Sequence, residues 1–339
     1  MKRSTAWVPA LGLLLLAVIG CAGDNESHAS TIATEVAADD HASVDTPFPT
    51  LLTTGVGVDV QLVRWAGSLR AEDHDQRQIE IDGHLCTLLE KFDLDLEPSG
   101  DPLQIDSPCV VLRDCRIQSE VPVSNEGAMV QQMAGNDLLV VDRCTFDGGA
   151  SHARGILAGP GDLIVRRSSF VRFGNAGVEF GDESGQRRLE VVDSYFEETG
   201  GWNPEDHVDG IQVGCGGDVR IVHNTVLVSP YGDDSKDPAY GSTSAVGLWA
   251  ELGDITGDVD IEGNLLGGGA FVLYLETRGG FRFDGTVTVT GNTFDMRYSD
   301  LGGIWGILAT STDSLELRWT ANRFSDGETA LATPTGRPD

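Results

Sequence analysis

Residues 205–226 read EDHVDGIQVGCGGDVRIVHNTV, and this stretch has the features of one coil of a β-solenoid. A polar turn precedes a short strand expected at residues 210–213, and the glycines that follow, Gly214, Gly216 and Gly217, can form a tight corner. A second strand is expected at residues 219–222, where apolar and polar residues alternate before a turn that contains Asn224. In a solenoid, this order of strand, corner, strand and turn must recur along the chain.

Eight segments repeat the second strand of this coil and its turn. They are VVLRDCRI (110–117), LVVDRCTF (139–146), LIVRRSSF (163–170), LEVVDSYF (189–196), VRIVHNTV (219–226), VDIEGNLL (259–266), VTVTGNTF (287–294) and LRWTANRF (317–324). Their last residues form an apolar column that suits an interior: Ile117, Phe146, Phe170, Phe196, Val226, Leu266, Phe294 and Phe324. Two positions earlier lies a column of small or polar residues: Cys115, Cys144, Ser168, Ser194, Asn224, Asn264, Asn292 and Asn322. Identical polar side chains in successive coils can hydrogen-bond along the stack, so we interpret the asparagines as structural and the two cysteines as buried fillers.

The copies follow one another at intervals of 24 to 40 residues, and no helical periodicity lies between them. Such a period, with short strands, predicts an all-β fold, a single parallel β-helix of about 9–11 coils. The Gly-Ile/Val strands followed by x-V-x-I-x-x-N-x-F/V strands resemble the pectate-lyase-like superfamily over residues 79–330, which implies a right-handed helix. That fold carries lyases, hydrolases, epimerases and adhesins, so the activity must be argued from the site.

The composition and net charge limit the kinds of partner that the protein can bind. The 339 residues carry a net charge of −30 and include 43 glycines, which suits many tight corners and a soluble, acidic surface. This charge repels nucleic acid, so no nucleic-acid partner is expected, and nothing in the sequence indicates more than a monomer.

The N-terminus resembles a bacterial lipoprotein signal. A basic start and a short apolar run end in V-I-G-C, which predicts a signal peptide at residues 1–20 and lipidation of Cys21. The alternative is a plain signal peptide that ends near a cysteine. We expect an exported lipoprotein at the outer membrane or cell surface, held by its lipid anchor only, with a flexible acidic tether at residues 21–49, the β-helix at 50–330 and a disordered tail at 331–339.

Five cysteines remain in the predicted domain, so at least one has no partner within the chain. They are Cys86, Cys109, Cys115, Cys144 and Cys215. An exported protein can keep disulfides, and Cys86 with Cys109 is the preferred pair because about one coil separates them. The alternative is that all five are buried thiols.

A second set of strands can be aligned on glycine: RGILA (154–158), AGVEF (176–180), DGIQV (209–213) and VGLWA (246–250). If the residue after glycine points inward, then Leu157, Glu179, Gln212 and Trp249 point outward on one face. Farther along, Glu251, Tyr274, Glu276 and Trp305 are expected to extend this column. Aromatic rings beside carboxylates suit sugar binding, and the alternative is that Trp249 and Trp305 pack under loops.

Polar residues precede these glycines. His152 and Arg154 align with Gly174 and Ala176, and then with His207 and Asp209. Long insertions flank this strand: residues 197–206 precede His207, and residues 229–244 account for the longest interval between repeats. Long insertions on one side of a regular scaffold often carry function, so we expect the site at this edge.

Residues 207–213, HVDGIQV, resemble the N-T-D-G-I-D motif of polygalacturonase-type glycoside hydrolases, and GDD at 232–234 resembles their second aspartate pair. The resemblance implies catalytic roles for Asp209, Asp233 and Asp234 in inverting hydrolysis between two carboxyl groups. The chain departs from this pattern at several positions: His207 replaces the family asparagine, Gln212 replaces the last aspartate, and the G-H-G and R-I-K motifs are missing.

A lyase reaction is the other catalytic interpretation. It needs a base, for which Lys236, Arg154, Arg220 and His207 are candidates, and a cation to neutralise a uronate carboxylate. The aspartates around Lys236, with Glu205 and Asp206, either hold Ca²⁺ or remain a solvated acidic loop; no other cofactor is indicated.

The sequence therefore predicts a protein that binds extracellular polysaccharide and cleaves it, as a lyase or a glycoside hydrolase. Its predicted catalytic residues are His207, Asp209, Asp233 and Asp234, and its predicted substrate-binding residues are His152, Arg154, Glu179, Gln212 and Trp249. The alternative is a non-catalytic surface module that binds glycan or forms a stiff rod.

Overall fold

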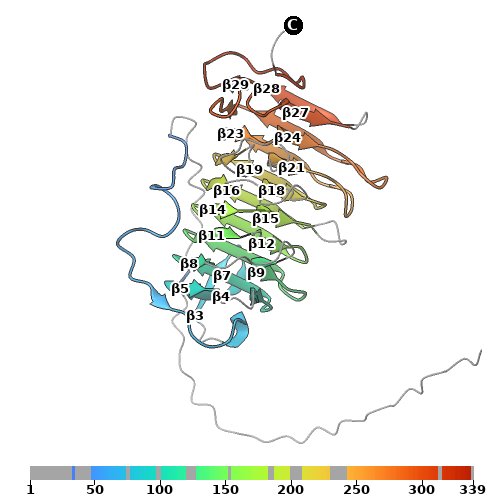
Figure 1. Ribbon diagram of the computed structural model, residues 1–339. Helices are drawn as coiled ribbons and strands as arrows, with labels where there is room; N and C mark the ends of the chain where they lie inside the picture. Colours follow the sequence, from blue (N-terminus) through green and yellow to red (C-terminus); the bar gives the residue numbers. More distant parts are fainter. Residues whose placement is uncertain are drawn as a thin grey trace, which may run out of the picture. The chain divides into compact units, whose positions relative to one another are not determined.

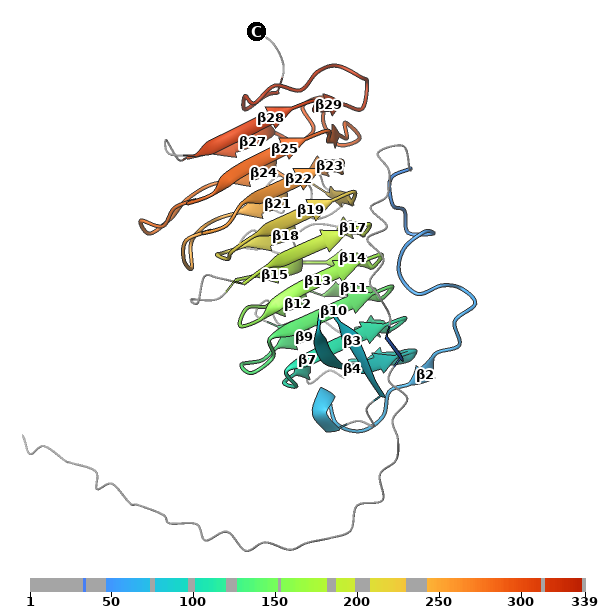
Figure 2. The ribbon, with the colours of Figure 1, turned by 180° about the vertical axis from the view of Figure 1, so that it is seen from behind.

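The computed structural model describes residues 33–34, 47–73, 77–96, 101–119, 127–151, 154–181, 187–198, 208–229, 243–311 and 315–336. These residues form almost only β-strands, in three long and mostly parallel sheets of 11, 10 and 8 strands. From β4 onward the chain visits the three sheets in turn, so that each circuit adds one strand to each sheet (Figures 1 and 2). The predicted all-β, parallel solenoid is confirmed at this level.

Sheet A contains β1 (Ala33–Thr34), β3 (Arg77–Ile81), β4 (His84–Glu90), β7 (Cys109–Arg113), β10 (Leu138–Asp142), β13 (Asp162–Arg166), β16 (Leu189–Val192), β19 (Val219–Val222), β22 (Val259–Glu262), β25 (Thr286–Thr290) and β28 (Glu316–Thr320). Sheet B contains β2 (Val63–Arg64), β5 (Phe92–Asp95), β8 (Arg116–Gln118), β11 (Thr145–Ser151), β14 (Ser169–Phe173), β17 (Tyr195–Glu198), β20 (Thr225–Val228), β23 (Leu265–Gly268), β26 (Thr293–Phe294) and β29 (Arg323–Phe324). Sheet C contains β6 (Leu103–Ile105), β9 (Ala128–Gln132), β12 (Arg154–Ala158), β15 (Ala176–Phe180), β18 (Asp209–Val213), β21 (Ser244–Leu248), β24 (Phe271–Leu275) and β27 (Gly306–Thr310). A short 3-10 helix, η1 (Ala71–Asp73), precedes β3.

The interior is built from the apolar column predicted from the repeats. All eight members are fully buried, and each pairs in register with the next along sheet B. The rings of Phe146, Phe170 and Phe196 stack face to face, with centroids 4.6 Å apart at each step. The strand spacing of a parallel sheet therefore equals the stacking distance of these rings.

The polar column forms a continuous hydrogen-bond ladder at the corner between sheets A and B. From Cys144 to Asn292, each member donates its backbone N–H to the side-chain oxygen of the member in the next coil, over 2.7–3.2 Å. The side-chain amides of the last four asparagines also donate to backbone carbonyls of the preceding coil, at 2.8 Å. The structural interpretation of the asparagines and the buried, free state of Cys115 and Cys144 are confirmed.

The residue before each ladder member adopts a left-handed backbone conformation. At Asp114, Arg143, Arg167, Asp193 and His223 the φ angle is 51–53°. This conformation costs roughly 1–2 kcal/mol for a residue with a Cβ atom, so the corner needs the ladder bonds that follow it.

A second, smaller core covers the outer face of the first strands of sheet A. Here β3 runs antiparallel to β4, and residues such as Ile79, Leu88, Val111 and Val140 form a separate buried cluster. Within this cluster Cys86 and Cys109 form a disulfide with a Cα–Cα distance of 4.5 Å, so the preferred pair is confirmed.

Two further segments of the chain pack against the sheets. The N-terminal segment, residues 47–65, runs back along the corner of sheets A and B, from Thr225, whose hydroxyl donates to the Pro49 carbonyl at 2.6 Å, to β5 (Figure 1). At the other end the Pro334 carbonyl accepts the Ile307 N–H at 2.8 Å.

Asn264→Ala should lower the free energy of unfolding by about 3 kcal/mol, because the buried N–H of Asn224 and the carbonyl of Ile221 lose their partners. Denaturant unfolding followed by circular dichroism measures this. Glu262→Ala, at an exposed position on sheet A, is the control and should change the value by less than about 0.5 kcal/mol. Equal losses in both variants would contradict a supporting role for the ladder.

The variant with both Cys86→Ala and Cys109→Ala should lose about 3 kcal/mol of stability, since the bridge joins residues 23 positions apart and restricts the unfolded chain. Peptide mapping after alkylation of the denatured protein without reductant should leave these two cysteines unlabelled and label Cys115, Cys144 and Cys215. Alkylation of Cys86 or Cys109 under those conditions would contradict the pairing.

Candidate functional site

The outer face of sheet C brings the predicted polar and aromatic side chains together. Glu179 pairs in register with Gln212, Gln212 with Gly247, and Gly247 with Tyr274. A second row begins each strand, where Ala176 pairs with Asp209 and Asp209 with Ser244. The predicted alignment of residue 176 with residue 209 is therefore confirmed.

Glycine at the second position of these strands has a steric reason. A Cβ atom on Gly155 would lie 2.9 Å from the ring of Phe170, and one on Gly210 would lie 2.7 Å from the Ala245 carbonyl oxygen. The residue after it, such as Ile156 or Ile211, is fully buried, so the prediction that this position points inward is correct.

The predicted position of Trp249 in the outward column is wrong. Gly247, not Trp249, pairs with Gln212, because Ala245 takes the place of the second-position glycine in β21. Trp249 follows the end of β21 and its indole folds back over Gly247, where a Cβ atom would collide with the indole ring. Only 5% of Trp249 is exposed, so it covers the sheet instead of projecting from it.

Asp209 is a carboxyl group buried on this face. It is 1% exposed, and its side chain accepts a hydrogen bond from the Ser244 hydroxyl and another from the Trp249 side chain. Burial, with a smaller contribution from the charge of Glu179, raises the pKa of Asp209 to about 7 in spite of the lowering effect of these bonds. Near neutral pH this group can therefore hold or release a proton.

Arg154 and Glu179 form an ion pair beside Asp209. They come from the neighbouring strands β12 and β15, and both side chains are largely buried, with 17% and 18% exposed. The guanidinium of Arg154 lies against the carboxylate of Glu179, and the charge of Glu179 contributes to the raised pKa of its neighbour Asp209. The carboxyl groups of Glu179 and Asp209 thus lie on the adjacent strands β15 and β18.

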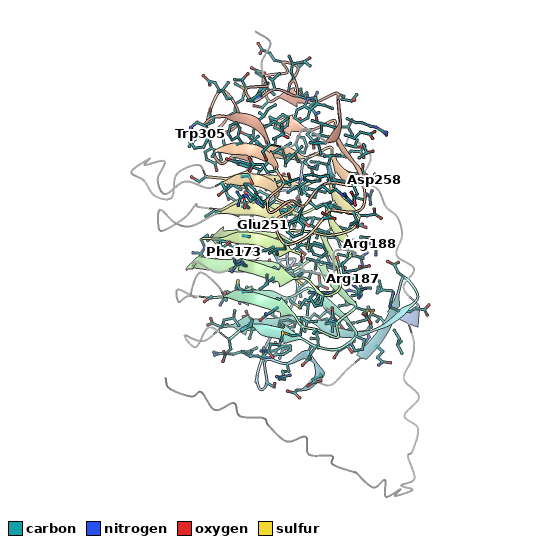
Figure 3. The ribbon with its side chains drawn as sticks, turned by 90° about the vertical axis from the view of Figure 1, so that its right-hand side faces the viewer. Phe173, Arg187, Arg188, Glu251, Asp258 and Trp305 are labelled. Carbon is teal, nitrogen blue, oxygen red and sulfur yellow. A yellow bond between two sulfur atoms is a disulfide. The ribbon has the colours of Figure 1, made fainter. Side chains whose placement is uncertain are left out.

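Aromatic side chains continue from Trp249 toward the C-terminal coils. Trp249 and Tyr274 have ring centroids 4.6 Å apart, Tyr274 and Phe271 5.5 Å, and Phe271 and Trp305 5.9 Å. The guanidinium of Arg278 lies over the Trp249 ring at 4.5 Å. Figure 3 shows Trp305 on one side of the stack, opposite Arg188 and Asp258.

Arg278 also binds the two carboxylates of this region. It contacts Glu251 at 3.1 Å and Glu276 at 3.9 Å. Burial, together with the charges of Glu276 and Asp209, raises the pKa of Tyr274 to about 12, so its hydroxyl remains protonated.

Several predicted site residues are not described. His152, His207, Asp233 and Asp234 lie outside the described residues, as do Lys236, Glu205, Asp206 and the lipidation residue Cys21. Arg220 is described and lies on sheet A, 3.4 Å from Glu190, so it is not part of the sheet C face and is wrong as a candidate base there. Within the described ranges, no group of three or more His, Cys, Asp or Glu side chains is arranged to hold a metal ion.

Three contributors were missed by sequence reasoning: Ser244, Phe271 and Arg278. The signal for Ser244 was available, because aligning β21 on Ala245 instead of Gly247 places this serine opposite Asp209. Phe271 then follows in the next strand at the same position. Nothing in the local sequence indicates that Arg278 lies over Trp249, since that contact arises from two separate turns.

No protein-family model, curated protein or solved structure matches this chain. Among the described residues there is also no helix long and apolar enough to cross a bilayer.

The stability of the protein should depend on pH through Asp209. Its folded pKa is raised, so between about pH 4 and 7 the folded state keeps a proton that the unfolded state has released, and the free energy of unfolding falls as pH rises. Over about three pH units this amounts to about 4 kcal/mol. Between about pH 4 and 7, the wild type should therefore lose about 4 kcal/mol of stability relative to Asp209→Asn.

Denaturant unfolding at several pH values tests this. Asp260→Asn, at an exposed aspartate on sheet A, is the matched control and should differ from the wild type by the same amount at every pH. A constant difference for Asp209→Asn as well would contradict a buried, protonated carboxyl group.

Proposed function

We propose that the outer face of sheet C binds an extracellular polysaccharide and that Asp209 donates a proton to the oxygen of the bond being cleaved. The observation that supports this most strongly is the raised pKa of a buried carboxyl group, Asp209, at the end of a row of aromatic rings. Perturbed carboxyl groups are typical of catalytic sites, and aromatic rings are typical of sugar sites.

The second carboxylate in this proposal is Glu179. Hydrolysis of a glycosidic bond uses one carboxyl group that is protonated and another that is ionised, and their environments set the two states apart. Asp209 fits the acid because burial favours its neutral form. Glu179 is the second carboxyl group beside Asp209 and is paired with Arg154, so we propose it as the base or nucleophile in place of a substrate-binding role.

This arrangement favours a hydrolase over a lyase. A lyase of this fold class needs a base that can remove a proton beside a uronate carboxylate. Arg154, the described candidate on this face, is already bound to Glu179. We also propose that Gln212 contacts the substrate. For residues outside the described ranges, the proposal keeps the roles expected from the sequence: catalysis by His207, Asp233, Asp234 or Lys236, a substrate contact by His152, and Ca²⁺ binding by the acidic loop.

A non-catalytic glycan-binding module is the second candidate. It is favoured by the 1% exposure of Asp209 and by its two hydrogen-bond donors, which are also what a purely structural buried carboxyl group would have.

The wider setting of the proposal follows from the sequence. We propose a monomeric, single right-handed β-helix of the pectate-lyase-like kind, exported as a lipoprotein and anchored through Cys21 at the outer membrane or cell surface. Right-handed crossovers are the rule for parallel strands joined within a sheet, which supports the handedness.

Asp209→Asn should lower the rate of polysaccharide cleavage about 10²- to 10⁴-fold, because the neutral amide cannot donate a proton as an acid does. The assay incubates the protein with neutral and acidic polysaccharides, with and without Ca²⁺, and measures new reducing ends and the ultraviolet absorbance of unsaturated uronates. Reducing ends without that absorbance are expected.

Asp260→Asn is the matched control and should retain wild-type activity. Full activity in Asp209→Asn would overturn the assignment of Asp209 as the acid. Unsaturated products would show that the enzyme is a lyase and not a hydrolase. Glycan binding without any cleavage by the wild type would favour the non-catalytic module.

A further inference from the structure

Among the described residues, the aromatic row leads from Asp209 toward the C-terminal coils. Trp249, Tyr274, Phe271 and Trp305 belong to the circuits of β21, β24 and β27, all C-terminal to β18, and successive rings are 4.6–5.9 Å apart. The contacts of Trp249 with Tyr274 and of Phe271 with Trp305 each join neighbouring coils, whereas Tyr274 and Phe271 lie on the same strand, β24. A ligand that follows the row therefore crosses the strands of sheet C obliquely, from the end of β21 toward the start of β27.

Exposure of the row increases with distance from Asp209. Trp249 is 5% exposed, Tyr274 and Phe271 are intermediate, and Trp305 is 59% exposed. The positions beside the outer rings are occupied by small residues, since Phe271 pairs with Gly306 and Tyr274 with Ala309. Ring faces near the far end of the row are therefore accessible to a flat, partly apolar ligand, and Trp305 is the most accessible of them.

The charges around the row disfavour an acidic ligand. Glu251, Glu276 and Glu179 supply three carboxylates, whereas Arg278 and Arg154 supply two guanidiniums, each of which already contacts a carboxylate. Binding a uronate would require one of these arginines to leave its partner. A neutral sugar instead offers hydroxyl groups that can donate hydrogen bonds to the carboxylates.

We propose that this aromatic row is the binding surface for the neutral pyranose residues of the substrate, with Trp305 as its outermost stacking platform. The inference rests on the proposed function and specifies its substrate class: an uncharged glycan that extends from Asp209 toward the C-terminal coils. Arg278 holds Glu251 and Glu276 beside the row and covers Trp249, which keeps the inner ring positioned over Gly247.

The test measures binding of hexasaccharides by isothermal titration calorimetry. The probes are hexamers of β-1,4-linked glucose, xylose and mannose and a hexamer of galacturonate, and the protein is the full chain carrying Asp209→Asn to prevent turnover. At least one neutral hexamer should bind more tightly than the galacturonate hexamer. Trp305→Ala should weaken that binding about tenfold, and Trp305→Phe should restore most of it.

Leu85→Ala is the control, because Leu85 is a large apolar side chain of similar exposure, 55%, on β4 and away from sheet C. It should leave binding unchanged. Unchanged affinity in Trp305→Ala, tighter binding of the galacturonate hexamer, or no binding of any hexamer would each overturn the inference. These outcomes are separate from the fate of the proposed acid, which is judged by cleavage in the protein with Asp209 intact.

Discussion

The fold depends on one requirement, that a buried backbone N–H at a sharp corner must find an acceptor. The corner between sheets A and B turns through a left-handed residue in each coil, and the N–H of the residue after it points along the stack. The side chain in the next coil supplies the acceptor, first as serine and then as asparagine. Each coil thereby sets the lateral position of the one after it, and the aromatic column beneath follows in register.

This requirement explains why the sequence could predict so much of the scaffold. Asn224, Asn264, Asn292 and Asn322 recur because each position has the same partner above and below, and the apolar residue two places later recurs for the same reason. The residue types at inward positions recur from coil to coil, so these positions can be aligned without knowledge of the structure. The residue types at outward positions do not recur, and their arrangement was predicted less well.

The error at Trp249 illustrates the difference. Glycine is needed at the second position of β12 and β18 for lack of space, but alanine fits in β21. The glycine two residues later, Gly247, instead leaves room for the folded-back indole of Trp249. An alignment on glycine therefore shifted this strand by two residues. Aligning β21 on Ala245 places Ser244 opposite Asp209, whereas the position of Arg278 depends on two separate turns and could not be predicted from the repeat.

The inward residues stabilise the stack, and the outward residues of sheet C form the candidate site. Since the inward residues and the corner ladder hold the coils together, the outer face of sheet C can carry a buried carboxyl group that destabilises the folded state at high pH. Charged and aromatic side chains there contact one another across adjacent coils, for example Arg154 with Glu179 and Trp249 with Tyr274. A rigid backbone at fixed strand spacing keeps such groups at defined separations.

The N-terminal segment has a consequence for the order in which the chain can assemble. Its Pro49 carbonyl bonds to Thr225, 176 residues later, and its Gly55 and Val56 amides bond to Arg167 and Thr145. These surfaces exist only after several later coils have stacked, and closing so long a loop is slow. A chain that emerges with its N-terminus first must therefore leave this segment undocked while the coils form, so the earliest part of the domain to appear is among the last to reach its final place.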